Sequence, residues 1–82
     1  MKNENWSVTA ETEHCVHVTI DESVDLANLE LTLISDVRIP IVKVKVESRD
    51  IKICSQTEKP MFAQLGDSVK YVKNSGYEYY KN

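Results

Sequence analysis

Apolar residues recur at every second position through much of this chain, and this spacing limits its fold more than any other feature. From residue 6 to residue 20, the apolar even positions are Trp6, Val8, Ala10, Val16, Val18 and Ile20. A period of two puts such residues on one face of a β-strand, whereas an amphipathic helix needs a period of about 3.6. The segment 6–20 is therefore one long strand or a hairpin. In a hairpin, a loop of three or five residues would pair Ala10 with Val16 and Val8 with Val18.

Residues 24–34 alternate in the same way, although Asp21 or Ser23 could cap a helix there. On a helical wheel, the apolar residues of this segment spread over more than half of the circumference, which is too wide for an amphipathic helix. The alternating apolar residues are Ala27, Leu29, Leu31 and Leu33. We predict a strand over 24–34, with a helix as the alternative.

An extended segment, 37–47, follows a turn at residues 35–36, and its apolar positions change parity at Pro40. Proline cannot donate a hydrogen bond to a neighbouring strand, so we expect a bulge or a sheet edge there. The four-residue loop that follows predicts a hairpin that pairs Val46 with Ile51.

Proline in the first turn and glycine just past the end are typical of a short helix, and Pro60 and Gly66 stand in this relation. We therefore predict a helix of about two turns near residues 59–65. A helix this short is stable only when it packs on a sheet, which Phe62 and Leu65 would do here.

The chain has 82 residues, of which 41% are apolar and 28% charged, so we expect a single domain spanning residues 1–82. Its longest apolar runs are two or three residues, far short of the ~20 that a membrane-spanning helix needs. The alternation predicts a mainly β fold, a small antiparallel sandwich or partly open barrel of six to seven short strands with one short helix.

Cys15 and Cys54 are too few and too far apart in sequence for a disulfide framework. Residues 1–5 lack the apolar run of a secretory signal. We therefore expect a cytoplasmic protein with two free thiols.

The net charge of −3 hides an asymmetry along the chain. Residues 1–36 carry a net charge of −7, whereas residues 37–82 carry a net charge of +4. An acidic surface could present carboxylates where a nucleic-acid-binding partner accepts phosphates, because such attraction does not depend on sequence. Solvated loops are the alternative. The candidate residues of this surface are Glu11, Glu13, Asp21, Glu22 and Asp25.

The basic half offers two further candidate surfaces. The predicted central hairpin puts Lys45 opposite Lys52 with Lys43 beside them, a like-charge arrangement that solvent or a bound anion must screen. A second hairpin, predicted around residues 74–76, would carry tyrosines suited to a protein interface or to stacking on single-stranded nucleic acid. A purely structural cross-strand pair is the alternative. The tyrosines are Tyr71, Tyr77, Tyr79 and Tyr80.

The segment 14–17 contains two histidines and Cys15, which suggests a metal site at first sight. Alternation along a strand, however, puts His14 on the face opposite to Cys15 and His17, short of the ligands that a zinc site needs. We predict no metal, no cofactor and no catalytic residue, because the sequence has no nucleophile motif and no phosphate-binding loop.

Together these features predict a small non-enzymatic interaction protein, an inhibitor or regulator that occludes a nucleic-acid-processing protein. The alternative is a module that binds single-stranded nucleic acid directly through Lys43, Lys45, Lys52 and the C-terminal tyrosines. A third expectation is homo-oligomerisation through a strand edge, because one thin core of this size is marginal. No membrane association is expected.

Overall fold

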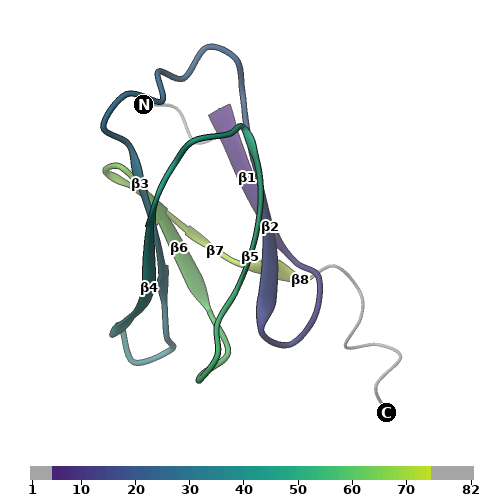
Figure 1. The fold of residues 1–82 in the computed structure, drawn as a ribbon. Helices are drawn as coiled ribbons and strands as arrows, with labels where there is room; N and C mark the ends of the chain where they lie inside the picture. Colours follow the sequence, from purple (N-terminus) through teal and green to yellow (C-terminus); the bar gives the residue numbers. More distant parts are fainter. Residues whose placement is uncertain (1–4, 75–82) are drawn as a thin grey trace.

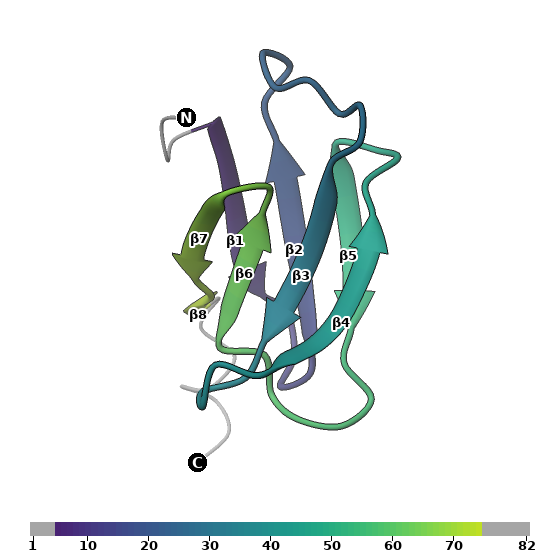
Figure 2. The ribbon, with the colours of Figure 1, turned by 90° about the vertical axis from the view of Figure 1, so that its left-hand side faces the viewer.

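The computed structural model describes residues 5–74, which form a sandwich of two four-stranded sheets (Figures 1 and 2). Sheet A has the strand order β5-β2-β1-β8, and sheet B has the order β4-β3-β6-β7. Seven strands pair antiparallel, and the short β8 lies parallel to β1. The strands are β1 (Trp6–Ala10), β2 (Cys15–Ile20), β3 (Glu30–Ile34), β4 (Pro40–Lys45), β5 (Asp50–Cys54), β6 (Phe62–Leu65), β7 (Ser68–Tyr71) and β8 (Lys73–Asn74). The mainly β sandwich predicted from the alternation is confirmed. No helix in the described residues has the length and apolar character to cross a membrane.

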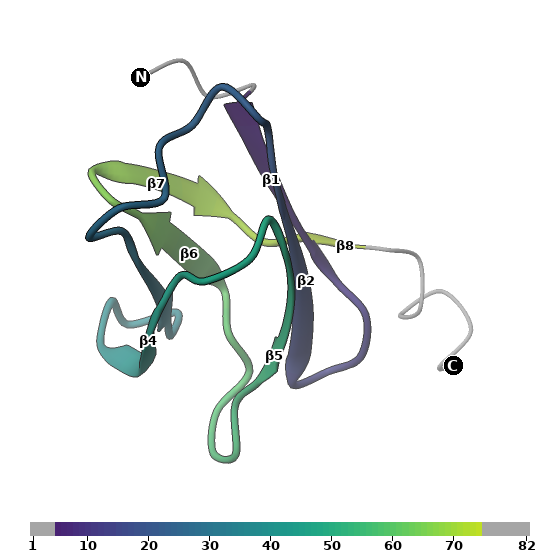
Figure 3. The ribbon, with the colours of Figure 1, turned by 45° about the horizontal axis from the view of Figure 1, so that its top comes forward.

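The N-terminal hairpin has the register that alternation predicts. Val8 lies opposite Val18 and Ala10 lies opposite Val16. The even-numbered residues of both strands are buried in the space between the sheets, where they meet the buried residues of sheet B. Figure 3 shows the two layers from near their upper end. The buried residues of β3 and β6 are Leu31, Leu33, Ala63 and Leu65, with Thr32 on the outer side.

The strand predicted over 24–34 is shorter than expected, because β3 begins only at Glu30. The preceding residues carry the chain from sheet A over the upper end of the sandwich to sheet B (Figure 1). Side chains hold this connection in turns: the Asp21 carboxylate accepts a hydrogen bond from the Ser23 N–H, and that of Asp25 accepts one from the Ala27 N–H. Such local side-chain bonds compete with a regular strand.

The turn and the irregularity around Pro40 are confirmed. The Ser35 N–H donates to the Ile39 carbonyl in the β3–β4 turn, and the pairing then shifts register between Leu33 and Ile34. The strand β4 also lies at an edge of sheet B. Pro40 thus stands at both a bulge and a sheet edge, where no neighbour needs its missing N–H.

The predicted central hairpin is wrong, because β4 and β5 lie in different sheets. Lys45 pairs with Glu30, and Lys52 pairs with His17. The residues between β4 and β5 carry the chain from one sheet to the other. A hairpin puts the apolar side chains of both segments on one face of a sheet, whereas such a crossing turns them toward each other across the core. Both arrangements need the same alternation, so alternation cannot distinguish them.

The predicted helix near residues 59–65 is also wrong, because Phe62–Leu65 is the strand β6. Its alternation has a period of two: Ala63 and Leu65 are buried, whereas Phe62 and Gln64 are half-buried on the outer face. Gly66 has a φ of 59° and begins the two-residue turn between β6 and β7. Gly66 therefore belongs to a hairpin turn, in which the first of the two turn residues needs a positive φ.

The prediction of two free thiols is wrong as well. Cys15 and Cys54 form a disulfide, with their Cα atoms 3.9 Å apart. The two residues lie directly opposite each other on β2 and β5. Sequence spacing could not reveal this pairing, because β5 reaches β2 only after the chain has passed through sheet B.

Candidate interaction surface

Exposed apolar side chains gather on one side of the molecule. Among residues 5–74, the large apolar residues that are exposed all belong to β7 or to the β3–β4 turn, both on the sheet B side of the sandwich. They are Val37 (63% exposed), Ile39 (56%), Val69 (47%) and Tyr71 (60%). Figure 2 views this side, with β7, β6, β3 and β4 in front. We call the outward surface of sheet B together with the β3–β4 turn the sheet B face.

An arginine and two aromatic rings form one contact cluster at the lower end of the sheet B face. The Arg38 guanidinium carbon lies 4.2 Å from the centroid of the Phe62 ring. The Tyr71 ring meets the Phe62 ring edge-on, with centroids 5.8 Å apart and an interplanar angle of 76°. Phe62 and Tyr71 are direct cross-strand partners, so the sheet itself sets this contact.

Arg38 occupies this position in an unusual backbone conformation. Its φ is 65°, in the left-handed region that favours glycine and costs other residues about 1–3 kcal/mol when the surroundings enforce it. The Arg38 N–H donates to the Ser35 carbonyl at 3.0 Å, which closes the turn. The turn therefore keeps a long cationic side chain where glycine would cost less.

The upper part of the sheet B face is polar and shallowly hollowed. A groove of about 290 Å³ runs across β4, β3 and β6, and its lining includes Glu30, Thr32, Lys43 and Gln64. The Lys43 ammonium lies 3.7 Å from the Glu30 carboxylate, and both side chains are exposed. Exposed pairs of this kind contribute little to stability, so both groups are available to a partner.

The structure separates the predicted lysine strip. Lys43 and Lys45 lie on the outer side of β4 in sheet B, and Lys52 lies on β5 in sheet A. The predicted acidic surface is separated too. Glu11 and Glu13 belong to the β1–β2 turn at one end of the sandwich. The β2–β3 connection at the opposite end (Figure 1) carries the other three, Asp21, Glu22 and Asp25.

Of the four predicted tyrosines, Tyr71 lies on the sheet B face. Tyr77, Tyr79 and Tyr80, and with them the predicted C-terminal hairpin, lie outside the described residues.

The histidine-rich segment is occupied by other contacts. The His17 side chain lies on the outer face of sheet A, where Nε2 contacts the Asp50 carboxylate and Nδ1 lies 3.8 Å from a Glu11 carboxylate oxygen. Cys15 and Cys54 are used in the disulfide. Within residues 5–74, no group of three or more histidine, cysteine or acidic side chains is placed to hold a metal ion.

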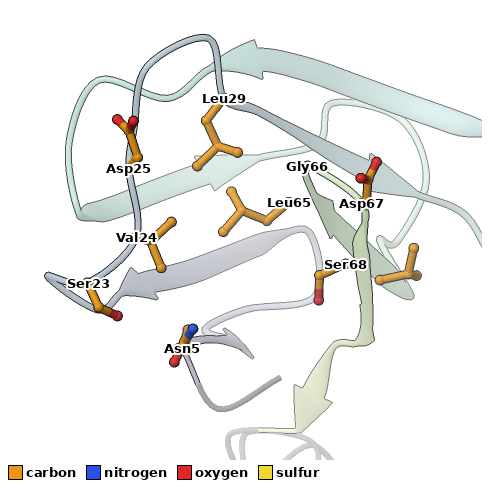
Figure 4. A pocket seen from close by; sticks show the side chains of 10 residues that line it. Asn5, Ser23, Val24, Asp25, Leu29, Leu65, Gly66, Asp67 and Ser68 are labelled. Carbon is orange, nitrogen blue, oxygen red and sulfur yellow. The ribbon is translucent and has the colours of Figure 1, made fainter. Parts of the chain in front are cut away.

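A second hollow opens at the upper end of the sandwich, between the β2–β3 connection and the β6–β7 turn (Figure 4). Its volume is about 610 Å³. The apolar side chains of Val24, Leu29 and Leu65 face one another inside it, and Asp25 and Asp67 stand on opposite sides of its rim. An apolar floor with carboxylates at the rim is chemically suited to the stem and head of an organic cation.

The sequence alone did not single out Arg38, Phe62 or the apolar residues beside them. One signal was present: the turn 35–39 contains Val37 and Ile39, although turns are usually polar. Two branched apolar residues in a turn indicate either burial or a contact surface, and the structure shows them exposed.

Comparison with protein-family models, with curated proteins and with solved structures gives no match to this chain.

Proposed function

We propose that this chain is a small protein-binding module, and that it binds its partner through the sheet B face. The observation that carries the proposal is Arg38, which is held in a costly left-handed conformation with its guanidinium over the Phe62 ring. Backbone strain of this kind clusters at functional sites, where the gain in function offsets its cost. The role is binding, with occlusion of the partner's surface as its mode of action.

The composition of the sheet B face supports this proposal. Arginine and aromatic side chains are enriched among residues that dominate the binding energy of protein interfaces. Here Arg38, Phe62 and Tyr71 form one cluster, and the exposed side chains of Val37 and Ile39 lie on the adjoining turn. The polar groove with Lys43 and Glu30 would form the hydrated rim of such an interface.

The prediction that the partner is a nucleic-acid-processing protein depends on the acidic residues. These lie at the two ends of the sandwich and not on the sheet B face. It stays a separate prediction, which reversal of charge at Glu11 and Glu13 would test by its effect on partner affinity.

Two pairs of variants test the proposal. Ile39→Asp and Tyr71→Asp place a charge on the sheet B face at positions that are more than half exposed, so neither opens the core. Thr19→Asp and Lys52→Asp are the matched controls, because both residues are exposed on the outer face of sheet A. Partners captured from the native host are identified by mass spectrometry, and their affinities are then measured with each purified variant.

A photocrosslinking residue at position 39 reports the contact directly, with position 19 as its control. We expect partner affinity to fall at least ~10-fold in the sheet B variants and to be unchanged in the controls, since interface centres concentrate binding energy. Crosslinking from position 39 and not from position 19 is expected as well. A partner that binds the Ile39→Asp and Tyr71→Asp variants as tightly as the wild type would show that the proposed surface is wrong.

A further inference from the structure

We propose that two copies of this chain associate through the outer edge of β7, with which no strand of residues 5–74 pairs, so that sheet B continues from one copy into the other. The inference rests on the proposed function, because the β7 edge borders the sheet B face and the second copy would be a partner at that border. The two proposals are nevertheless distinguishable, since this one depends on the outward backbone groups of β7 and on Val69, which lies outside the cluster of Arg38, Phe62 and Tyr71.

The backbone hydrogen bonds of β7 show which residues point toward the outer edge. Within the described residues β7 pairs with β6 and with no other strand. The Val72 N–H donates to the Met61 carbonyl at 2.9 Å, which sets the phase of the antiparallel ladder. Because alternate residues direct their N–H and C=O groups to opposite sides of a strand, those of Val69 and Tyr71 point away from β6.

Two other edge strands are protected against pairing, and β7 is not. On β4, the residues in the same outward phase are Lys43 and Lys45, and the strand also carries the bulge at Pro40. On β5, the corresponding residues include Asp50 and Lys52. Charged residues, proline and bulges at an edge prevent another strand from adding to it.

The outward residues of β7 are instead apolar and aromatic. Val69 is 47% exposed and Tyr71 is 60% exposed. The edges thus differ in kind: the charged edges of β4 and β5 exclude a further strand, whereas the β7 edge offers backbone groups that no described strand pairs with, flanked by side chains that favour pairing.

The occupant that best fits this edge is a second copy, because β7 is complementary to itself. An antiparallel pair centred on Lys70 would place Val69 opposite Tyr71 of the second copy, and Tyr71 opposite its Val69. Pairs of an aromatic and a β-branched residue are favourable across strands. The outward N–H groups of Val69 and Tyr71 would also donate to the outward C=O groups of these residues in the second copy, and their C=O groups would accept in turn.

Lys70 does not obstruct this pairing, although two lysines would meet at its centre. The Lys70 ammonium donates to the Trp6 carbonyl and lies 5.0 Å from the centroid of the Trp6 ring. Its charge is therefore held against Trp6 of its own chain, on the face of the sheet opposite to Val69 and Tyr71.

Analytical ultracentrifugation of the full chain tests the inference. Val69→Pro removes the outward N–H without removing a hydrogen bond to β6, and Lys52→Pro is the matched control at an outward position of β5, outside the sheet B face. We expect a concentration-dependent monomer–dimer equilibrium in the wild type. The dimer dissociation constant should rise at least ~10-fold in Val69→Pro and stay unchanged in Lys52→Pro. Val69→Lys, which copies the protection of β4, should act like Val69→Pro and replaces it if the proline variant does not fold.

Amide hydrogen exchange supplies a second readout, since dimer formation should slow exchange at Val69 and Tyr71 as the protein concentration rises. A wild type that stays monomeric up to millimolar concentration overturns the inference, as does a folded Val69→Lys variant that dimerises like the wild type. A monomeric wild type whose hetero-partner is lost in Ile39→Asp would leave the proposed function standing while this inference fails. A dimer that persists in Ile39→Asp, with no hetero-partner, would have the opposite meaning.

Discussion

The disulfide between Cys15 and Cys54 should account for a large part of the free energy of unfolding. It joins β2 to β5 through two cysteines that lie 39 positions apart in the sequence. Closing a loop of this length restricts the unfolded chain and, in the chain-entropy treatment, is worth about 4 kcal/mol at 25 °C. A domain of 82 residues has a total free energy of unfolding of about 4–12 kcal/mol. Loss of the bond should therefore remove a third of the stability or more.

Urea unfolding measures this contribution, with the fluorescence of the buried Trp6 as the signal. The three samples are the oxidised wild type, the reduced wild type and the double variant Cys15→Ser/Cys54→Ser. The reduced protein and the double variant should agree within ~1 kcal/mol, because both lose the same cross-link at a surface site. Their thermal midpoints should lie about 16–32 °C below that of the oxidised protein.

Unfolding of the double variant and the oxidised wild type at the same urea concentration would show that the disulfide does not stabilise the fold. Reaction of both cysteines of the native protein with a thiol reagent before any reductant is added would show that the disulfide is absent. Alkylation in the intact host cell tests the cytoplasmic prediction at the same time, since disulfides persist mainly in oxidising compartments.

Three further predictions follow from single side chains. Leu33→Ala should lower the free energy of unfolding by about 2–5 kcal/mol, because Leu33 is fully buried. Val37→Ala, at an exposed site, should change it by less than ~0.5 kcal/mol. Urea unfolding measures both changes. Arg38→Gly should leave stability within ~1 kcal/mol of the wild type, because relief of the left-handed strain offsets the lost contact with Phe62, while partner affinity falls at least ~10-fold; equal affinity would contradict the role of Arg38. Hydrogen bonds from the Ser23 side chain and N–H hold the pKa of the Asp21 carboxyl below its usual range, so Ser23→Ala should raise that pKa in an NMR titration. Because the Asp21 pKa is lower in the folded state than in the unfolded state, the ionised carboxylate stabilises the fold above the usual aspartate pKa. This stabilisation is lost as the pH falls through the folded-state pKa, and Ser23→Ala should make the free energy of unfolding less dependent on acid pH.

Alternation predicted the pairing of β1 with β2 and the irregularity between β3 and β4, where neighbouring segments of sequence are also neighbours in a sheet. The even positions left open whether residues 6–20 form one strand or a hairpin, but for a hairpin they fixed the register of β1 and β2, because a slip by one residue would expose Val8 and Val18. The bulge at Pro40 was predictable for the same local reason, since the change of apolar parity is visible in the sequence.

Alternation could not show which strands belong to the same sheet. Val44 and Ile53 face the interior whether β4 and β5 pair side by side or lie in opposite layers. The predicted lysine strip is separated for this reason, because it required β4 and β5 to pair side by side. The contact between Arg38, Phe62 and Tyr71 could not be predicted either. Pro60 and Gly66 predict a helix that contains Phe62, whereas its partner across the sheet, Tyr71, is predicted in a separate C-terminal hairpin.

The way the chain alternates between the two sheets also bears on how the molecule can form. The connections from β2 to β3, β4 to β5, β5 to β6 and β7 to β8 each pass from one layer to the other. Neither layer is therefore encoded by a continuous stretch of sequence. A nascent chain that has emerged only as far as β4 contains β1 and β2 of sheet A and β3 and β4 of sheet B, so both sheets are incomplete. Folding should wait for distant segments to meet, which places this small protein among the slow folders, on a scale of milliseconds to seconds, despite its size.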